Sequence, residues 1–271
     1  MPERRSCTLE GVSLDQTPTD EPLEPVIDPP STTYLPTPRT TPTRLRERAS
    51  YDREAVHAVL DEAYICHVGY ALDGAPAVLP NIHARVDDVL YLHGSTGMRL
   101  AKAARTAPVP VCVTVTLLDG LVLARSWFHH SMNYRCAVVR GEATLVTDPD
   151  ERDRAFEAIV NHVVPGRAAQ SRPPDAKERA ATAILRVPLV EVSLKHRSGG
   201  VNDDEEDYAL PHWAGVVPLA TVPGEPRPDG ELPPSAASPT IDPRRGARSA
   251  AARSATRSPA RSDAPREAPT L

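Results

Sequence analysis

Several features that would assign this chain to a common functional class are missing from its 271 residues. No run of apolar residues approaches the roughly 18 that a transmembrane helix needs, and the N-terminus lacks the apolar region of a signal peptide. The four cysteines form no C-x-x-C pair, which argues against a zinc site and a disulfide framework. Neither G-x-G-x-x-G nor the P-loop lysine motif occurs, so dinucleotide and nucleoside-triphosphate folds lose support. These absences predict a soluble cytoplasmic protein.

Proline is abundant, and its distribution divides the chain. Residues 1–42 hold nine prolines and seven acidic residues, and residues 223–271 hold ten prolines among many Ala, Arg and Ser. Neither segment has enough large apolar side chains to offset the entropy of ordering it, so both are predicted to be disordered tails. Residues 43–222 are left as one domain. The net charge of −5 argues against specific nucleic-acid binding.

Turn signals predict a mainly antiparallel sheet. Asp73-Gly74 and Asp119-Gly120 each lie between apolar runs and are typical of two-residue hairpins, and Asp87-Asp88 is a third expected turn. Gly141 is expected to form a bulge. Strands are predicted at 65–71, 75–86, 89–93, 111–118, 121–128, 135–146 and 186–195.

Helix-start signals occur at four places between these strands. Asp148-Pro149 and Asp175 with Glu178 combine a capping residue with proline or an acid in the first turn. Few helices beside antiparallel hairpins favour an α+β barrel over a doubly wound sheet. The helices are expected at 52–63, capped by Asp52; at 97–105, capped by Ser95 or Thr96; from 149 to about 163; and near 176–184.

Two neighbouring segments carry polar side chains that folding alone does not explain. In the first, a strand ending in Ser95 and Thr96 runs into a helix start with Arg99 and Lys102. Such a helix start offers free backbone N–H groups and positive charge to an anion such as a phosphate.

The second segment runs from Arg125 to Arg135 and includes Ser126, His129, His130 and Asn133. If it is a strand, the two histidines point to opposite faces, so at most one of them lines a given pocket. A histidine here can bind a ligand or relay a proton, or it can be a hydrogen-bonded interface residue.

The motifs that include these segments resemble a known family. They are Arg48–Arg53, Leu90–Ser95, Thr116–Ser126, Phe128–Arg135 and Trp213–Val216. Together they resemble the flavin-nucleotide-binding branch of the pyridoxamine 5′-phosphate oxidase-like proteins, to which the 5-nitroimidazole-resistance reductases are related. The resemblance covers about two thirds of the chain. It implies an antiparallel split β-barrel with peripheral helices, a homodimer, and FMN bound at the dimer interface.

The resemblance also implies roles for individual residues. Arg99, with Lys102, Ser95 and Thr96, would bind the FMN phosphate. His130 would be the catalytic residue beside the flavin. Ser126, His129 and Asn133 would reach the cofactor of the partner subunit, together with Tyr134 and Arg135, whereas Arg125 would pair with an acid at the interface. The second strand would form the wall against the flavin ring through Val78, Pro80, Asn81, Ile82 and His83.

The predicted function is therefore that of an FMN-dependent oxidoreductase. A reduced nicotinamide or another donor would supply electrons, and a small acceptor, such as a nitro or quinone compound, would take them. Two alternatives remain open: a flavin-binding carrier or sensor without turnover, and a haem binder with a histidine axial ligand. No metal site and no membrane partner are predicted.

Overall fold

The computed structural model describes residues 31–233, 236, 238–239 and 241. The chain divides into two units, Met1–Ser31 and Thr32–Leu271, and every helix and strand described below belongs to the second. Most of both predicted tails therefore lies outside the described residues. The N-terminal boundary at residue 42 needs correction, because Tyr34 is only 3% exposed and lies in the core. The Tyr34 N–H donates to Tyr51 O at 2.8 Å, so the segment from Thr32 packs on the domain.

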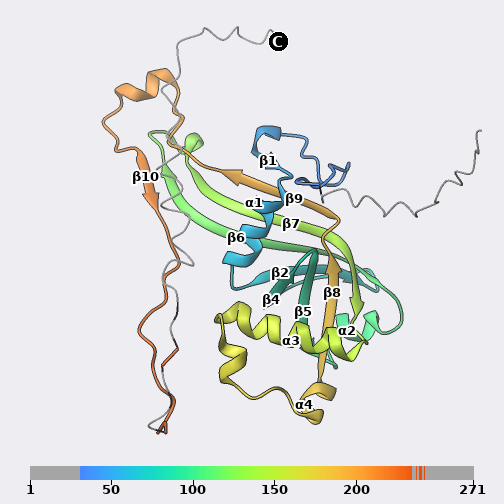
Figure 1. The fold of residues 1–271 in the computed structure, drawn as a ribbon. Helices are drawn as coiled ribbons and strands as arrows, with labels where there is room; N and C mark the ends of the chain where they lie inside the picture. The colour runs from blue at the N-terminus through green and yellow to red at the C-terminus, as the bar shows by residue number, and fades with distance from the viewer. Residues whose placement is uncertain (1–30, 234–235, 237, 240, 242–271) are drawn as a thin grey trace, which may run out of the picture. The chain divides into compact units, whose positions relative to one another are not determined.

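Ten strands form one antiparallel sheet that curls without closing (Figure 1). The main path runs in the order β3-β2-β6-β7-β8-β5-β4, while β9 pairs with β7 and β1, and β10 pairs with β6. This arrangement confirms the predicted α+β split barrel. The strands are β1 (Ala49–Ser50), β2 (Cys66–Leu72), β3 (Ala75–Asn81), β4 (His83–Val86), β5 (Val89–Ser95), β6 (Val109–Leu123), β7 (Ser131–Leu145), β8 (Thr182–Pro188), β9 (Glu191–Arg197) and β10 (Gly215–Pro218).

The longest hairpin differs from its prediction. β6 continues through Asp119-Gly120, where the pairing with β7 shifts register and leaves Asp119 as a bulge, and the chain turns only at residues 124–130. Asp119 is held there by Arg135 of β7, and β10 packs so close to Gly120 that a Cβ there would lie 3.0 Å from Val217 O. The predicted bulge at Gly141 is wrong, because the ladder stays in register there.

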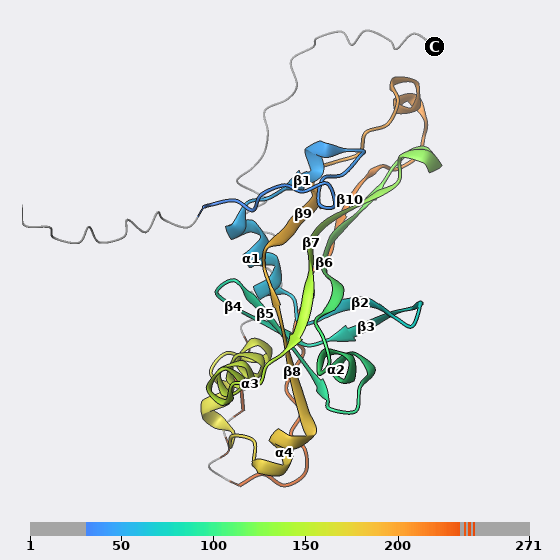
Figure 2. The same ribbon diagram turned by 90° about the vertical axis from the view of Figure 1, so that its right-hand side faces the viewer.

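The four α-helices of the described residues lie around the sheet (Figures 1 and 2). α3 packs against β4 and β8, and α1 packs against β4, β7 and β9. The predicted caps at Asp52, Asp148 and Asp175 are confirmed, since each carboxylate accepts a backbone N–H of the first turn. No helix in the described part of the chain is long and apolar enough to cross a membrane. The helices are α1 (Arg53–Glu62), α2 (Arg99–Ala104), α3 (Pro149–Val163) and α4 (Ala176–Ala181).

The core consists of two apolar clusters. The larger one fills the barrel beneath α1, and the smaller one lies between α3 and strands β4, β5 and β8. Cys66 belongs to the larger cluster, and burial raises the pKa of its thiol to about 12, so this sulfur stays protonated at neutral pH. Cys66, Cys112 and Cys136 all lie in strands and are free thiols, as predicted.

Candidate cofactor site

The predicted phosphate turn has a different local structure from the expected one. β5 extends to Ser95, which still pairs with Thr182, and α2 begins only at Arg99 with Met98 as its N-cap. Ser95 and Thr96 therefore do not cap the helix. The Ser95 hydroxyl accepts the Gly97 N–H at 3.1 Å instead, and the Thr96 N–H donates to Ala181 O.

The two cations of this turn are available to a ligand. The Arg99 side chain is 65% exposed and its partner Asp73 is 92% exposed, with the nearest N and O atoms 3.4 Å apart. Lys102 is exposed and has no ion pair among the described residues. An exposed ion pair of this kind contributes little to stability, so an incoming anion can compete for Arg99.

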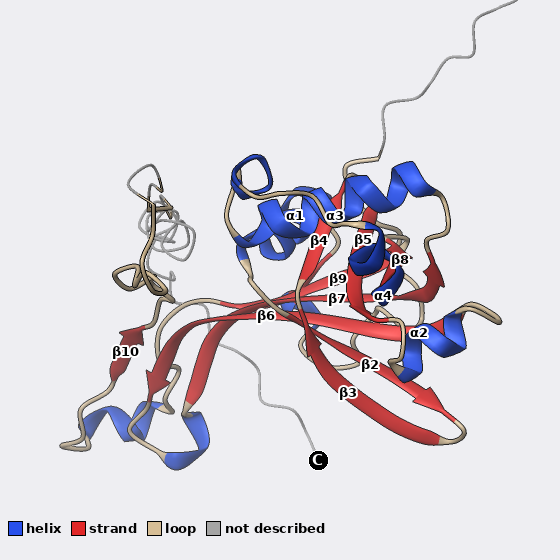
Figure 3. Ribbon diagram, turned by 90° about the horizontal axis from the view of Figure 1, so that it is seen from below, coloured by secondary structure: helices blue, strands red, loops and turns tan. Residues whose placement is uncertain are grey.

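β3 runs beside this turn and is joined to it near both of its ends. Arg99 reaches Asp73 in the β2–β3 turn, and the Asn81 amide at the end of β3 donates to His93 O of β5 at 2.8 Å. Between these contacts, Val78 and Leu79 are exposed apolar side chains on an edge strand. The structure therefore brings the predicted wall and the predicted phosphate turn to one edge of the barrel (Figure 3).

Two buried polar atoms at this edge lack a hydrogen-bond partner among the described residues: Asn81 Oδ1 and His93 Nδ1. Buried polar atoms are normally paired, so these two atoms are available to hydrogen-bond a ligand. His93 was not among the predicted site residues. The available signal was its position, because a polar side chain follows three apolar residues in β5.

Two of the predicted wall residues belong to the interior instead. Ile82 connects β3 to β4 and packs against the smaller core cluster. His83 is 0% exposed: its Nε2 lies 2.8 Å from Leu60 O of α1, and its ring lies 4.7 Å from the ring of His162. Because the chain changes strands at Ile82, the wall is limited to residues up to Asn81.

The segment with the paired histidines is a turn and not a strand. After β6 ends at Leu123, a 3-10 helix, η2 (Trp127–His129), leads into β7. His130 is exposed, and its Nδ1 lies 2.8 Å from Ser126 O. If Nδ1 carries the proton that this contact requires, Nε2 is left as an exposed acceptor.

His129 points toward the C-terminal part of the domain. Its Nε2 lies 3.2 Å from a carboxylate oxygen of Asp204, which precedes the 3-10 helix η4 (Glu205–Ala209). Asp207 lies close by, and ligand atoms of the three side chains are within 4.8 Å of one another, a group that can hold a metal ion. The sequence did not predict this grouping.

The remaining polar residues of the segment are occupied within the chain. Arg125 pairs with the buried Asp203 of its own chain, whereas the sequence predicted a pair with an acid at the dimer interface. Burial alone would raise the pKa of the Asp203 carboxyl, but hydrogen bonds from Arg125 hold it below its ordinary value. The Asn133 amide donates to Gly199 O at 3.0 Å and accepts from Arg197. The Ser126 hydroxyl is buried without a partner among the described residues.

Arg135 is also unavailable for a cofactor. Its guanidinium makes two hydrogen bonds to Glu62 of α1 and two to Asp119 of the β6 bulge, at 2.7–3.0 Å. Burial alone would lower the pKa of Arg135, but these two carboxylates raise it above its ordinary value. The residue therefore ties α1 to the central hairpin as a permanent cation.

A profile of the pyridoxamine 5′-phosphate oxidase family matches residues 52–196, more than half of the chain. This chain belongs to that family. The predicted family resemblance is thereby confirmed. The flavocytochrome Anf3 from Azotobacter vinelandii is 39% identical over 76% of this chain and 95% of its own, with a TM-score of 0.70. The FAD and haem binding protein from Mycobacterium smegmatis is 36% identical over 71% of this chain and 94% of its own, with a TM-score of 0.67. No match is found among curated proteins.

In this member of the pyridoxamine 5′-phosphate oxidase family, one chain keeps the two halves of the predicted site apart. α2 contacts β6, which begins at Val109, whereas η2 follows its other end at Leu123, and β6 spans about 45 Å at the usual rise of a strand. Figures 1 and 3 show the β6–β7 ribbon extending away from α2 and β3. Within one chain, therefore, His130 and Ser126 do not meet Arg99.

The far end of the ribbon carries an apolar surface. Trp127 is 97% exposed and Phe128 is 88% exposed, and Met132 and Trp213 are also largely open. Large exposed apolar patches are typical of interaction sites rather than of solvent-facing surface.

Proposed function

We propose that this protein is an oxidoreductase that binds a flavin and a haem. The observation that carries the proposal is that two relatives, each covering more than two thirds of this chain at 36–39% identity, are named for both groups. One is a flavocytochrome, and the other binds FAD and haem. The proposal therefore combines the predicted flavin with the haem that the sequence left open as an alternative. Because one relative is named for FAD, we propose FAD in place of the predicted FMN.

The edge formed by β3 and the Ser95–Lys102 turn suits a flavin nucleotide. Lys102 and Arg99, whose ion pair with Asp73 is exposed, are accessible to a phosphate. Val78, Pro80 and Asn81 offer an apolar strand with one amide for the ring. The bound flavin would exchange electron pairs with a donor such as a reduced nicotinamide, and a small acceptor would be reduced. The residues of the chain orient the flavin and limit access to it.

A homodimer would complete this edge. The predicted contacts of Ser126, His130 and their neighbours with a cofactor cannot be made within one chain, but a second copy can supply them. The exposed Trp127 and Phe128 beside His130 support this proposal, because pairing two chains would remove them from water. His130 would then act at its Nε2, which can accept or return a proton near the flavin.

His93 is the residue that we propose for the haem iron. Imidazole is the commonest protein ligand in haem proteins of the globin and peroxidase types. The half-buried His93 lies beside the proposed flavin edge, and its Nδ1 has no hydrogen-bond partner among the described residues, whereas His83 is completely buried beneath α1. The chemistry of this side chain thus fits a haem next to the flavin edge.

The absorption spectrum of the full chain, purified without added cofactor, tests the proposal. We expect the visible bands of oxidised flavin together with a Soret band, and chromatography of the released flavin should show FAD. The His93→Ala variant should lose the Soret band and keep the flavin bands, whereas His130→Ala should keep both. A wild-type spectrum with flavin alone would refute the haem assignment, and a spectrum without flavin would refute the function as a whole. If the protein contains both cofactors but turns over no pair of electron donor and acceptor, it is a carrier or a sensor.

The phosphate assignment has its own test. Arg99→Ala should weaken flavin binding by about 1–3 kcal/mol, the range for losing a charge-assisted hydrogen bond. Titration of the apoprotein with FAD and with FMN measures this, and sedimentation velocity should show that the variant remains the proposed dimer. Arg105→Ala, an exposed arginine just after α2, is the matched control. Equal flavin affinity for wild type and Arg99→Ala would remove Arg99 from the site.

A further inference from the structure

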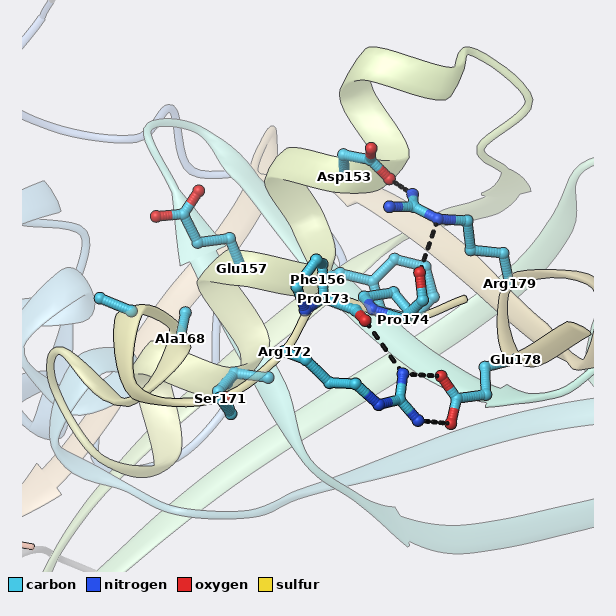
Figure 4. A pocket seen from close by; sticks show the side chains of 12 residues that line it. Asp153, Phe156, Glu157, Ala168, Ser171, Arg172, Pro173, Pro174, Glu178 and Arg179 are labelled. Atoms are coloured by element: carbon cyan, nitrogen blue, oxygen red, sulfur yellow. Dashed lines mark hydrogen bonds and ion pairs between the residues drawn. The ribbon is translucent and has the colours of Figure 1, made fainter. Parts of the chain in front are cut away.

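A cavity of 620 Å³ lies between α3 and the segment that follows it (Figure 4). Its volume falls in the range of about 300–1,000 Å³ that is usual for small-molecule sites. One face of α3 and residues 168–179, which include the start of α4, form its lining. None of the residues assigned above to the flavin or the haem takes part.

The floor of this cavity is apolar. Phe156 and Val160 lie one turn apart on α3, and Ala168, Pro173 and Pro174 of the following segment complete the apolar lining. Two prolines give this connecting segment a restricted backbone, so it cannot easily collapse onto the helix. The floor is therefore suited to the apolar body of a ligand.

The charges around the cavity are unequally compensated. Arg172 forms a two-point ion pair with Glu178, with N–O distances of 2.7 and 2.6 Å, and Arg179 pairs with Asp153 while its Nε donates to Pro174 O. The hydrogen bond from Arg172 and that from the Asp175 N–H lower the pKa of Glu178 to about 2, so this pair stays ionised at neutral pH. Both arginines of the rim are therefore already neutralised.

One carboxylate of the lining has no such partner. Glu157 also lines the cavity and is exposed, and no side chain among the described residues pairs with it. The nearby Arg152 does not line the cavity and donates to the carbonyl groups of Arg179 and Thr182. At Glu157, an incoming cation would thus meet a carboxylate of the lining that no arginine compensates.

We propose that this cavity binds a small molecule with an apolar, ring-containing body and a single protonated amine. The body would lie on Phe156 and Val160, and the ammonium would pair with Glu157. An anionic ligand would be disfavoured, because both arginines would have to leave their present partners. This site is independent of the flavin and haem site.

Three ligands of equal length test the proposal by their charge: tryptamine, tryptophol and indole-3-propionate. Calorimetry with the full-length protein should show saturable binding in the order amine, alcohol, acid. The amine should bind about fivefold more tightly than the alcohol, as expected for one partly exposed ion pair. Glu157→Gln should reduce tryptamine binding to the tryptophol level, and Glu142→Gln, an exposed glutamate on β7, should leave it unchanged.

A second variant locates the site. Val160→Trp fills the cavity and should abolish binding of all three ligands, while its circular dichroism and its flavin and haem spectra stay unchanged. Tryptamine binding that survives Val160→Trp would place the site elsewhere. Equal affinity for amine and alcohol, or no saturable binding at millimolar ligand, would overturn the proposal. None of these outcomes affects the proposed redox function.

Discussion

Replacing Arg135 with alanine is expected to lower the free energy of unfolding by about 3–5 kcal/mol, the range for removing one partner of a buried ion pair. The Arg135 side chain is only 23% exposed, and it makes four hydrogen bonds to Glu62 and Asp119. Its loss leaves two largely buried carboxylates next to each other without a cation. The contact between α1 and the β6 bulge would be lost at the same time.

Urea unfolding followed by circular dichroism measures this change. Arg135→Lys keeps the charge, but an ammonium group cannot make paired hydrogen bonds to both Glu62 and Asp119. The stability of this variant should therefore lie between those of wild type and Arg135→Ala. Arg105→Ala is the control, because Arg105 is exposed and makes no ion pair among the described residues. A loss below about 1 kcal/mol for Arg135→Ala would mean that the network is no more than a surface ion pair.

His83→Ala is expected to cost about 3 kcal/mol of stability and to leave the flavin affinity of the folded protein unchanged. His83 is completely buried, its ring contacts Leu60 O near the end of α1, and it packs against the His162 ring at an interplanar angle of 49°. The substitution leaves a cavity and takes a hydrogen-bond partner from the end of the helix. This expectation follows from the core position of His83, and it contradicts the earlier placement in the flavin wall.

Urea unfolding, together with a flavin titration under folding conditions, separates a structural role of His83 in the core from a role in the flavin wall. His130→Ala should stay within about 0.5 kcal/mol of wild-type stability because His130 is exposed. A His83→Ala variant that is as stable as wild type but binds flavin more weakly would show that His83 belongs to the flavin wall. Loss of stability with intact flavin binding confirms the interior role.

Local signals predicted the elements well where a few adjacent residues decide the conformation. Asp73-Gly74 forms the expected hairpin, since both residues adopt the positive φ that the turn requires, 54° and 75°. Asp119-Gly120 is the same dipeptide with a different outcome. There the Asp119 carboxylate is held by Arg135, sixteen residues away in the sequence, and β10 covers the strand, so the chain stays extended.

In the candidate site, too, local signals were readable from the sequence and contacts between distant segments were not. The cationic turn and the edge strand were recognised from sequence, but the interior position of His83 and the missing partner of His93 were not. Burial of a histidine depends on which helix packs over its strand, and neither periodicity nor motif specifies that. Likewise, the hydrogen bonds that occupy Arg135 within the chain depend on Glu62 of α1, which is distant in the sequence.

The sequence by itself determined the family, the antiparallel character of the sheet and the positions of three helix caps, because these depend on motifs and on interactions within a few residues. Only the tertiary structure decided where the long β6–β7 ribbon turns, which histidines are interior, and which arginines remain free for a ligand. Those outcomes depend on contacts between side chains from distant segments. Such contacts exist only after the sheet has formed and the helices have packed against it.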